Sequence, residues 1–240
     1  MDIYIICIII LTTAIQSLFG VGVLLFGTPL MLLLGHSFLE TLLILLPVSV
    51  IINLLQFLIY YKEIDRNFYK SIIKFSTPCI ILSLYFIAKT NYDSSIFIGI
   101  FLLLISIKDL FPILKYIYER LFKLDKIFFI FLGIIHGITN LGGSLLTAKV
   151  FNENLDKLQK RSTIAISYMT FAVFQIITIL FLDVKFKSEY FLYIFAGVFA
   201  YLVVNKIFFY KISEERYQIL FKVFLALSGI LLILKRYIVW

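Results

Sequence analysis

Glycines and small polar residues interrupt two long apolar stretches of this sequence, and they are the residues best suited to bind a ligand. Where a helix restarts after such an interruption, several backbone N–H groups lack an intrahelical partner and the helix dipole adds about half a positive charge. An anion can bind there without lysine or arginine. Alternatively, the glycines serve only close packing of helices in lipid. The candidate substrate-binding residues at the two interruptions are Gly20, Gly22, Gly27, Thr28, His136, Thr139, Asn140, Gly142, Gly143 and Ser144.

Three further candidates are the amides Asn53, Gln56 and Gln175, which lie inside otherwise apolar segments. An unpaired amide in such a place costs a few kcal/mol, so each needs a partner. Interhelical hydrogen bonds would satisfy them, and so would a substrate; both interpretations stay open. His136 is the titratable group nearest to an interruption and could carry a proton, contact substrate or serve packing alone.

The sequence has no recognisable catalytic machinery. It has no Ser/His/Asp grouping, no paired buried carboxylates and no Walker-type GxxxxGK[ST], and the GxG at 20–22 lacks the context of a dinucleotide fingerprint. Cys7 and Cys79 form no metal-ligand spacing. We therefore expect no enzyme, no cofactor and no metal, and we expect transport driven by an ion gradient or by the substrate's own gradient.

The composition places these residues in a membrane. Of the 240 residues 62% are hydrophobic and 15% are charged, with a mean hydropathy of +1.05; soluble domains have about 45–50% and about 25%. Residues 3–39 contain no Asp, Glu, Lys or Arg, well beyond the roughly 18 residues that mark a spanning segment. The net charge of +8 is spread over short loops, which favours the positive-inside rule over nucleic-acid binding. The sequence predicts an all-α integral membrane protein.

The apolar runs divide into two similar halves. They cover 3–18, 22–34, 38–61, 71–88, 95–114, 127–139, 141–148, 162–182, 190–209 and 217–234. One helix over 3–34 would be about 48 Å long, against roughly 30 Å of hydrocarbon, so it must break. Aligning Gly20 with Gly137, with one gap, also aligns Gln56 approximately with Gln175. We expect a single membrane domain over 1–240, with repeat one at about 1–115, a linker at 116–126 and repeat two at about 127–240.

Charge indicates how the repeats are oriented. If each broken element crosses the membrane once, both repeats point the same way and the loops carry 13 basic residues inside against 9 outside. If each is a re-entrant hairpin, the repeats are inverted and the count becomes 17 to 5. The second count favours two inverted repeats, each a broken, re-entrant helical hairpin plus three transmembrane helices. Both termini are then outside, and the glycine-rich tips meet near the midplane, as in secondary transporters.

The sequence resembles the sulfite exporter TauE/SafE family of membrane transporters at both interruptions. The resemblance is carried by the stretches 19–35 and 133–147, followed by Asp156, Lys157 and Arg161. It implies movement of a small anion, often sulfur-containing such as sulfite or a sulfonate, across the cell membrane. We expect a secondary transporter or exporter of such an anion; the alternatives are a passive anion channel and, further off, a membrane-embedded enzyme or structural partner protein.

The expected partners are the lipid bilayer and a small anionic substrate, with no nucleic acid. Coupling to H⁺ or Na⁺, the direction of transport and a homo-oligomer all stay open, because apolar helix faces look alike toward lipid and toward a second copy.

Overall fold

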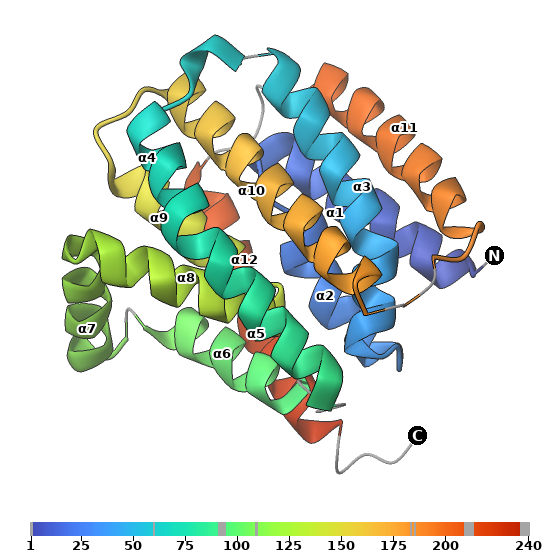
Figure 1. The fold of residues 1–240 in the computed structure, drawn as a ribbon, viewed down its shortest axis with the longest axis horizontal. Coiled ribbons are helices and arrows are strands. Elements are labelled where there is room, and N and C mark those ends of the chain that lie inside the picture. Colours follow the sequence, from blue (N-terminus) through green and yellow to red (C-terminus); the bar gives the residue numbers. More distant parts are fainter. Residues whose placement is uncertain are drawn as a thin grey trace.

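The computed structural model describes residues 2–59, 61–90, 95–108, 110–182, 184, 186–208 and 214–235, and every regular element in them is a helix (Figure 1). The predicted all-α membrane fold class is confirmed. The elements are α1 (Ile3–Phe19), α2 (Val23–Leu33), α3 (Phe38–Ile59), the 3₁₀ turn η1 (Tyr61–Glu63), α4 (Arg66–Ser71), the π-helical turn η2 (Ile72–Ser76), α5 (Thr77–Thr90), α6 (Ser95–Ile107), α7 (Pro112–Lys123), α8 (Asp125–Thr139), α9 (Gly143–Asn152), α10 (Lys157–Leu180), α11 (Tyr190–Phe208) and α12 (Glu214–Leu234).

Three helical segments among the described residues are long and apolar enough to cross a bilayer, namely Phe38–Ile59, Arg66–Thr90 and Leu158–Leu180. The second joins α4, η2 and α5, and its π-helical turn ends at Ser76, two residues before Pro78. Proline has no N–H and its ring displaces the carbonyl four residues earlier, which explains the local widening. Shorter apolar helices, Ile3–Ser17, Val23–Leu33, Tyr190–Asn205 and Val223–Leu234, accompany these segments.

The apolar run 95–114 is not one helix. α6 ends at Ile107 and α7 starts at Pro112, with an angle of 99° between them. Phe111 is extended (φ −114°, ψ 114°) because the residue before a proline avoids the helical region, and proline then starts the next helix well. Part of the stretch predicted as a linker is therefore helical.

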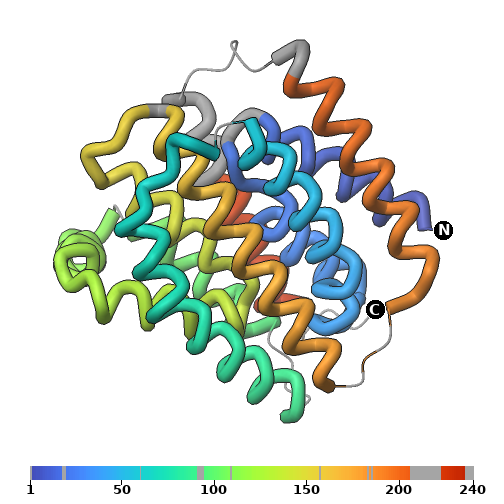
Figure 2. The backbone as a smooth tube through the Cα atoms, turned by 45° about the horizontal axis from the view of Figure 1, so that its top comes forward, coloured from blue at the N-terminus to red at the C-terminus, as the bar shows by residue number. Residues whose placement is uncertain are grey.

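The helices pack in pairs that exchange between the two halves. α3 packs on α10 and α6 packs on α12, whereas α1 packs on α11 and α8 packs on α5. Figure 1 shows α10 between α3 and α5, and Figure 2 shows α11 on the outside beside α1. Each half therefore packs its first broken helix on a helix of the other half.

Both interruptions have the same backbone geometry. α1 ends at Gly20 (φ 79°) and α8 ends at Asn140 (φ 61°), both left-handed, and their N–H groups donate to the carbonyls of Gln16 and His136 four residues earlier. Glycine adopts this conformation at little cost and asparagine more readily than other side-chain-bearing residues. In backbone geometry Gly20 therefore matches Asn140 and not Gly137, with which the sequence alignment had paired it.

After each break the chain turns back on the helix that it has left. A Cβ on Gly22 would come within 2.4 Å of the carbonyl oxygen of Thr12, ten residues earlier. In the second element, Lys149 of α9 forms an ion pair of 2.8 Å with Asp125, the first residue of α8. The two ends of this second element therefore meet again. Neither α1–α2 nor α8–α9 is one continuous rod.

Cross-contacts define two ends of the bundle. At one end, the N–H of Asp65 donates to Thr163 Oγ1 (3.0 Å) and Arg161 Nη2 donates to Asn205 Oδ1 (3.4 Å). At the other, Lys235 Nζ donates to the carbonyl of Leu32 (2.6 Å). We call these the Asp65 end and the Lys235 end. The ion pair of Lys149 with Asp125 joins the start of α8 to the end of α9.

Candidate functional site

The two broken elements touch each other inside the bundle. Asn140, at the second break, donates from Nδ2 to Thr28 Oγ1 of α2 over 2.9 Å, across 112 positions of sequence. Both side chains are fully buried. Asn140 Oδ1 has no hydrogen-bond partner among the described residues. The left-handed cap at Asn140 aims its amide at the other half, so one residue both ends a helix and joins the two halves.

A polar network closes the first break. Gln16 Oε1 accepts from the N–H of Val23 (2.9 Å), and Gln16 Nε2 donates to Asn53 Oδ1 (3.1 Å). Asn53 Nδ2 donates to the carbonyl and hydroxyl of Ser49, and Gln56 Nε2 donates to the carbonyl of Gln16 (3.1 Å). Asn53 and Gln56 therefore have interhelical partners here, on α1. Gln16 was not among the predicted site residues, although its place four residues before Gly20 was a usable signal.

The second break has an equivalent but less complete network. His136 matches Gln16 in position, and its Nε2 lies 3.2 Å from Gln175 Oε1. Because an amide oxygen only accepts, the ring nitrogen is the donor in this contact. His136 Nδ1 and Gln175 Nε2 have no partner in the described part of the chain, and both residues are fully buried. Unsatisfied groups at this depth normally meet water or a ligand.

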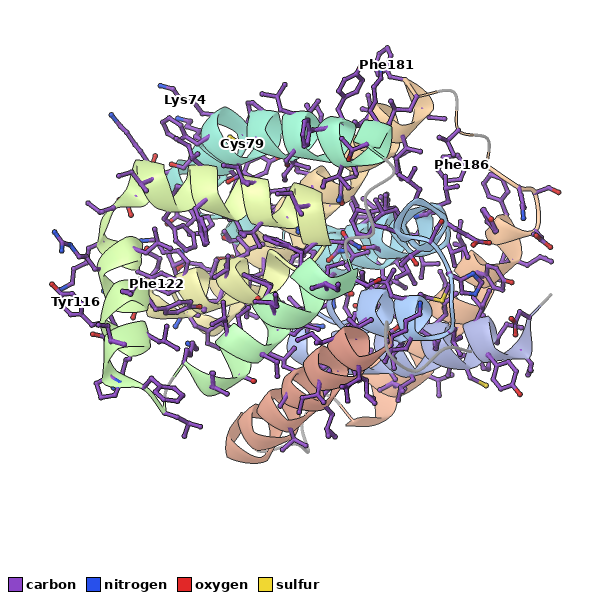
Figure 3. The ribbon with its side chains drawn as sticks, turned by 90° about the horizontal axis from the view of Figure 1, so that it is seen from below. Lys74, Cys79, Tyr116, Phe122, Phe181 and Phe186 are labelled. Atoms are coloured by element: carbon purple, nitrogen blue, oxygen red, sulfur yellow. The ribbon has the colours of Figure 1, made fainter. Side chains whose placement is uncertain are left out.

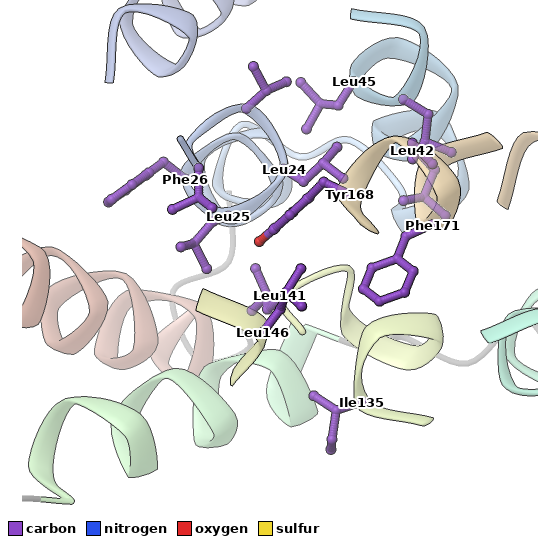
Figure 4. Close-up of a cluster of buried hydrophobic side chains, with 14 of the residues drawn as sticks. Leu24, Leu25, Phe26, Leu42, Leu45, Ile135, Leu141, Leu146, Tyr168 and Phe171 are labelled. Carbon is purple, nitrogen blue, oxygen red and sulfur yellow. The ribbon is translucent and has the colours of Figure 1, made fainter. Parts of the chain in front are cut away.

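Tyr168 lies over the start of α9 and was missed by the sequence analysis. A Cβ on Gly143 would overlap the Tyr168 hydroxyl oxygen, so any larger residue at this position must displace the tyrosine side chain. Figure 4 shows Tyr168 among Leu24, Leu25 and Leu141, at the junction of α2, α10 and the second break. Its ring also stands edge-on to His136, with centroids 6.1 Å apart. No sequence signal identifies it, because a tyrosine in an apolar helix is common.

The remaining predicted residues shape the breaks. The Thr139 hydroxyl donates to the carbonyl of Ile135, and the Ser144 hydroxyl donates to the carbonyl of Leu141. The Thr139 hydroxyl also accepts from the N–H of Leu141. Three glycines pack so closely that an added Cβ would overlap a neighbouring residue: Gly22 would meet Gln16, Gly27 would meet Leu45 and Gly142 would meet His136. Gly20 has open space around it. The structure thus gathers Thr28, Asn140 and the second-break residues together and leaves Asn53 and Gln56 around Gln16. No group of three or more His, Cys, Asp or Glu residues gathers within the described ranges.

These features define a helical membrane protein whose two broken helices meet in its interior. The model of the sulfite exporter TauE/SafE family matches residues 5–232 of the 240, and the chain belongs to this family. The resemblance stated from the two interruptions is confirmed. The family is one of membrane transporters. Comparison with curated proteins and with solved structures gave no match.

Proposed function

We propose that this protein is a secondary transporter or exporter of a small anion, a sulfur oxyanion such as sulfite or a sulfonate, which binds between the two broken elements. The observation that carries this proposal is the buried hydrogen bond between Asn140 and Thr28, since it puts both breaks at one place. Broken helices from two units that meet in the membrane are the usual construction of a secondary transporter site. Catalysis has no corresponding support.

The chemistry around the breaks favours an anion. α2 and α9 both start there, and the N–H groups of their first turns point toward the break, with that of Val23 already bonded to Gln16 Oε1. Gln175 Nε2 is a buried donor without a partner. Arg161 adds positive charge beside the first break, where its Nη2 donates to the carbonyl of Ser17 (3.4 Å). An oxyanion would satisfy these donors; the acceptors Asn140 Oδ1 and Gln56 Oε1, which have no partner among the described residues, need a hydrogen-bond donor such as water.

The two units are proposed to be inverted, with both termini outside. The exchanged packing of α1 with α11 and of α8 with α5 supports two related units. Arg66, at the start of α4, and Arg161, in the first two turns of α10, lie at the same end of the bundle, as the Asp65–Thr163 contact indicates. Basic residues favour the cytoplasm, so the Asp65 end faces inward.

The direct test is uptake of sulfite, sulfonates and small carboxylates by proteoliposomes that contain the full chain. We expect saturable flux of a sulfur oxyanion that is stimulated by unlabelled substrate on the other side. Flux that neither saturates nor responds to exchange would instead identify a passive channel. The absence of flux for every anion would contradict transport.

A matched pair of variants ties the flux to the site. Thr28→Val removes the hydroxyl that accepts from Asn140, and Thr41→Val makes the same change at an equally buried threonine whose hydroxyl has no partner among the described residues. We expect Thr28→Val to lower kcat/KM by about tenfold, equivalent to about 1.4 kcal/mol, and Thr41→Val to leave it near the wild-type value. Equal effects of the two changes would remove the contact from the mechanism.

A further inference from the structure

α7 differs from the other helices because it exposes an apolar stripe beside a charged face. Ile113, Tyr116 and Ile117 are 69%, 59% and 56% exposed and follow helical spacing. Since α7 is turned 99° from the apolar helix α6, it runs across the direction of the bundle. Figure 3 shows Tyr116 directed outward and Phe122 directed inward. A helix of this kind lies along the membrane surface with its apolar stripe among the lipid chains.

A cavity of about 530 Å³ lies between this helix and the end of α9. Three lysines, Lys108, Lys115 and Lys123, and one acid, Glu119, contribute its charged lining, so the formal charge is 3 − 1 = +2. Ala148, Phe151 and Asn152 supply the α9 wall. The cavity thus combines cations with apolar surface.

The walls of this cavity are held in place by contacts between elements. Lys108 Nζ stands 3.9 Å from the centre of the Tyr118 ring, which ties the end of α6 to α7. Lys149 of α9 donates to the carbonyl of Phe122 (2.9 Å) and to Asp125 Oδ1, which ties α7 to the α8–α9 element. A ligand in the cavity would therefore contact the wall of the second broken element.

We propose that this cavity binds the phosphate group of an anionic phospholipid while the apolar stripe of α7 inserts among the chains of the same leaflet. Clusters of lysines at the membrane surface attract anionic lipid, and the apolar stripe on the opposite face of the same helix provides the second signal that stable lipid binding requires. A free phosphate would contact the lysines alone. The exposed apolar side chains of Ile113, Tyr116 and Ile117 are favourable only where they contact lipid chains. The proposal does not depend on the transported substrate.

The test measures lipid bound to the purified full chain in a nonionic detergent, by native mass spectrometry, with phosphatidylglycerol and phosphatidylcholine as probes. One variant combines Lys108→Gln, Lys115→Gln and Lys123→Gln. Its matched control combines Lys62→Gln, Lys70→Gln and Lys74→Gln, three exposed lysines outside the cavity. Glu119→Gln changes the lining in the opposite direction. Inorganic phosphate and glycerol 3-phosphate serve as soluble competitors.

We expect a preference for phosphatidylglycerol that falls by roughly fivefold for each lysine removed from the cavity, stays near wild type in the control and rises in Glu119→Gln. Because Glu119→Gln is expected to gain affinity, misfolding cannot imitate its result. Equal losses in both triple variants would reduce the effect to general surface charge and overturn the proposal. Displacement of phosphatidylglycerol by inorganic phosphate at comparable concentration would mean that the cavity binds a free anion, and it would overturn the proposal of a lipid site.

Discussion

The contact between Asn140 and Thr28 can be measured by a double-mutant cycle. Asn140→Gly removes the amide without straining the backbone, because glycine tolerates a φ of 61°. Thr28→Val removes the hydroxyl and keeps the shape of the side chain. Each variant deletes one partner of a 2.9 Å hydrogen bond between two fully buried side chains. The cycle therefore isolates this contact.

The two single changes should differ in cost. Thr28→Val leaves the Nδ2 group of Asn140 buried without an acceptor, which costs about 1–3 kcal/mol. Asn140→Gly also removes Oδ1, which already lacks a partner among the described residues, so it should cost less. In the double variant no orphaned donor remains, and its loss should approach that of Asn140→Gly alone. The resulting coupling should be about 1 kcal/mol, within the range found between transmembrane helices.

The assay is unfolding of the purified protein by SDS titration, with free energies of unfolding compared for the four chains. Asn140→Ala is a useful addition, because it removes the same amide but adds about 1–2 kcal/mol of left-handed backbone strain. Additive losses, within about 0.3–0.5 kcal/mol, would mean that the two side chains do not interact. That result would refute the meeting of the two breaks.

Three further results follow from the same geometry. Gly143→Ala should displace the Tyr168 hydroxyl and lower both thermal stability and transport, whereas Gly35→Ala, at a left-handed glycine with open space for a Cβ, should cost only the backbone strain of about 1–2 kcal/mol. A melting temperature of Gly143→Ala equal to that of the unchanged chain would contradict the close approach. Gln16→Leu should destabilise the fold by about 1–3 kcal/mol, because it leaves Val23 and Asn53 without their partner. Gln175→Leu leaves only His136 Nε2 without its acceptor and removes the unpaired Nε2, so it should destabilise less and also raise KM for transport; an unchanged KM in flux assays would contradict a substrate contact at Gln175. In a Cys7→Ser/Cys79→Ser background, Asn154→Cys should react with an impermeant thiol reagent only from the cytoplasm; labelling from outside intact cells would restore the model with four crossings per repeat.

The sequence was sufficient to predict the helical membrane fold and the two breaks, because both depend on local composition. The excess of apolar residues requires lipid, and a charge-free stretch of 37 residues, 3–39, cannot remain one helix inside a bilayer. The alignment of the halves failed for a specific reason. Glycine was matched with glycine, whereas the left-handed position is filled by Gly20 in one half and Asn140 in the other. Two residue types with the same conformational preference hide the correspondence.

The long-range partners were beyond the reach of the sequence. Gln16, Asn53 and Gln56 come together because the C-terminal end of α1 reaches α3, and nothing near each amide reveals the others. Tyr168 is a candidate only through its distance to Gly143. The helix α7 was divided between an apolar run and a linker, since its stripe of Ile113, Tyr116 and Ile117 is amphipathic and does not form a continuous apolar run.

The two halves use equivalent positions for different purposes. In the first half, Gln16 uses both its oxygen and its nitrogen on protein groups, and Gln56 Oε1 is the buried atom of this network without a partner among the described residues. In the second half, His136 replaces Gln16 and has only two ring nitrogens, of which one bonds Gln175 and the other has no partner in the described chain. Because a buried unpaired group costs free energy that the fold must offset, its retention at the second break has a reason only when a ligand or water completes it. Both breaks therefore keep a buried polar atom for water or a ligand, and Asn140 and Thr28 join the two breaks where the substrate is proposed to bind.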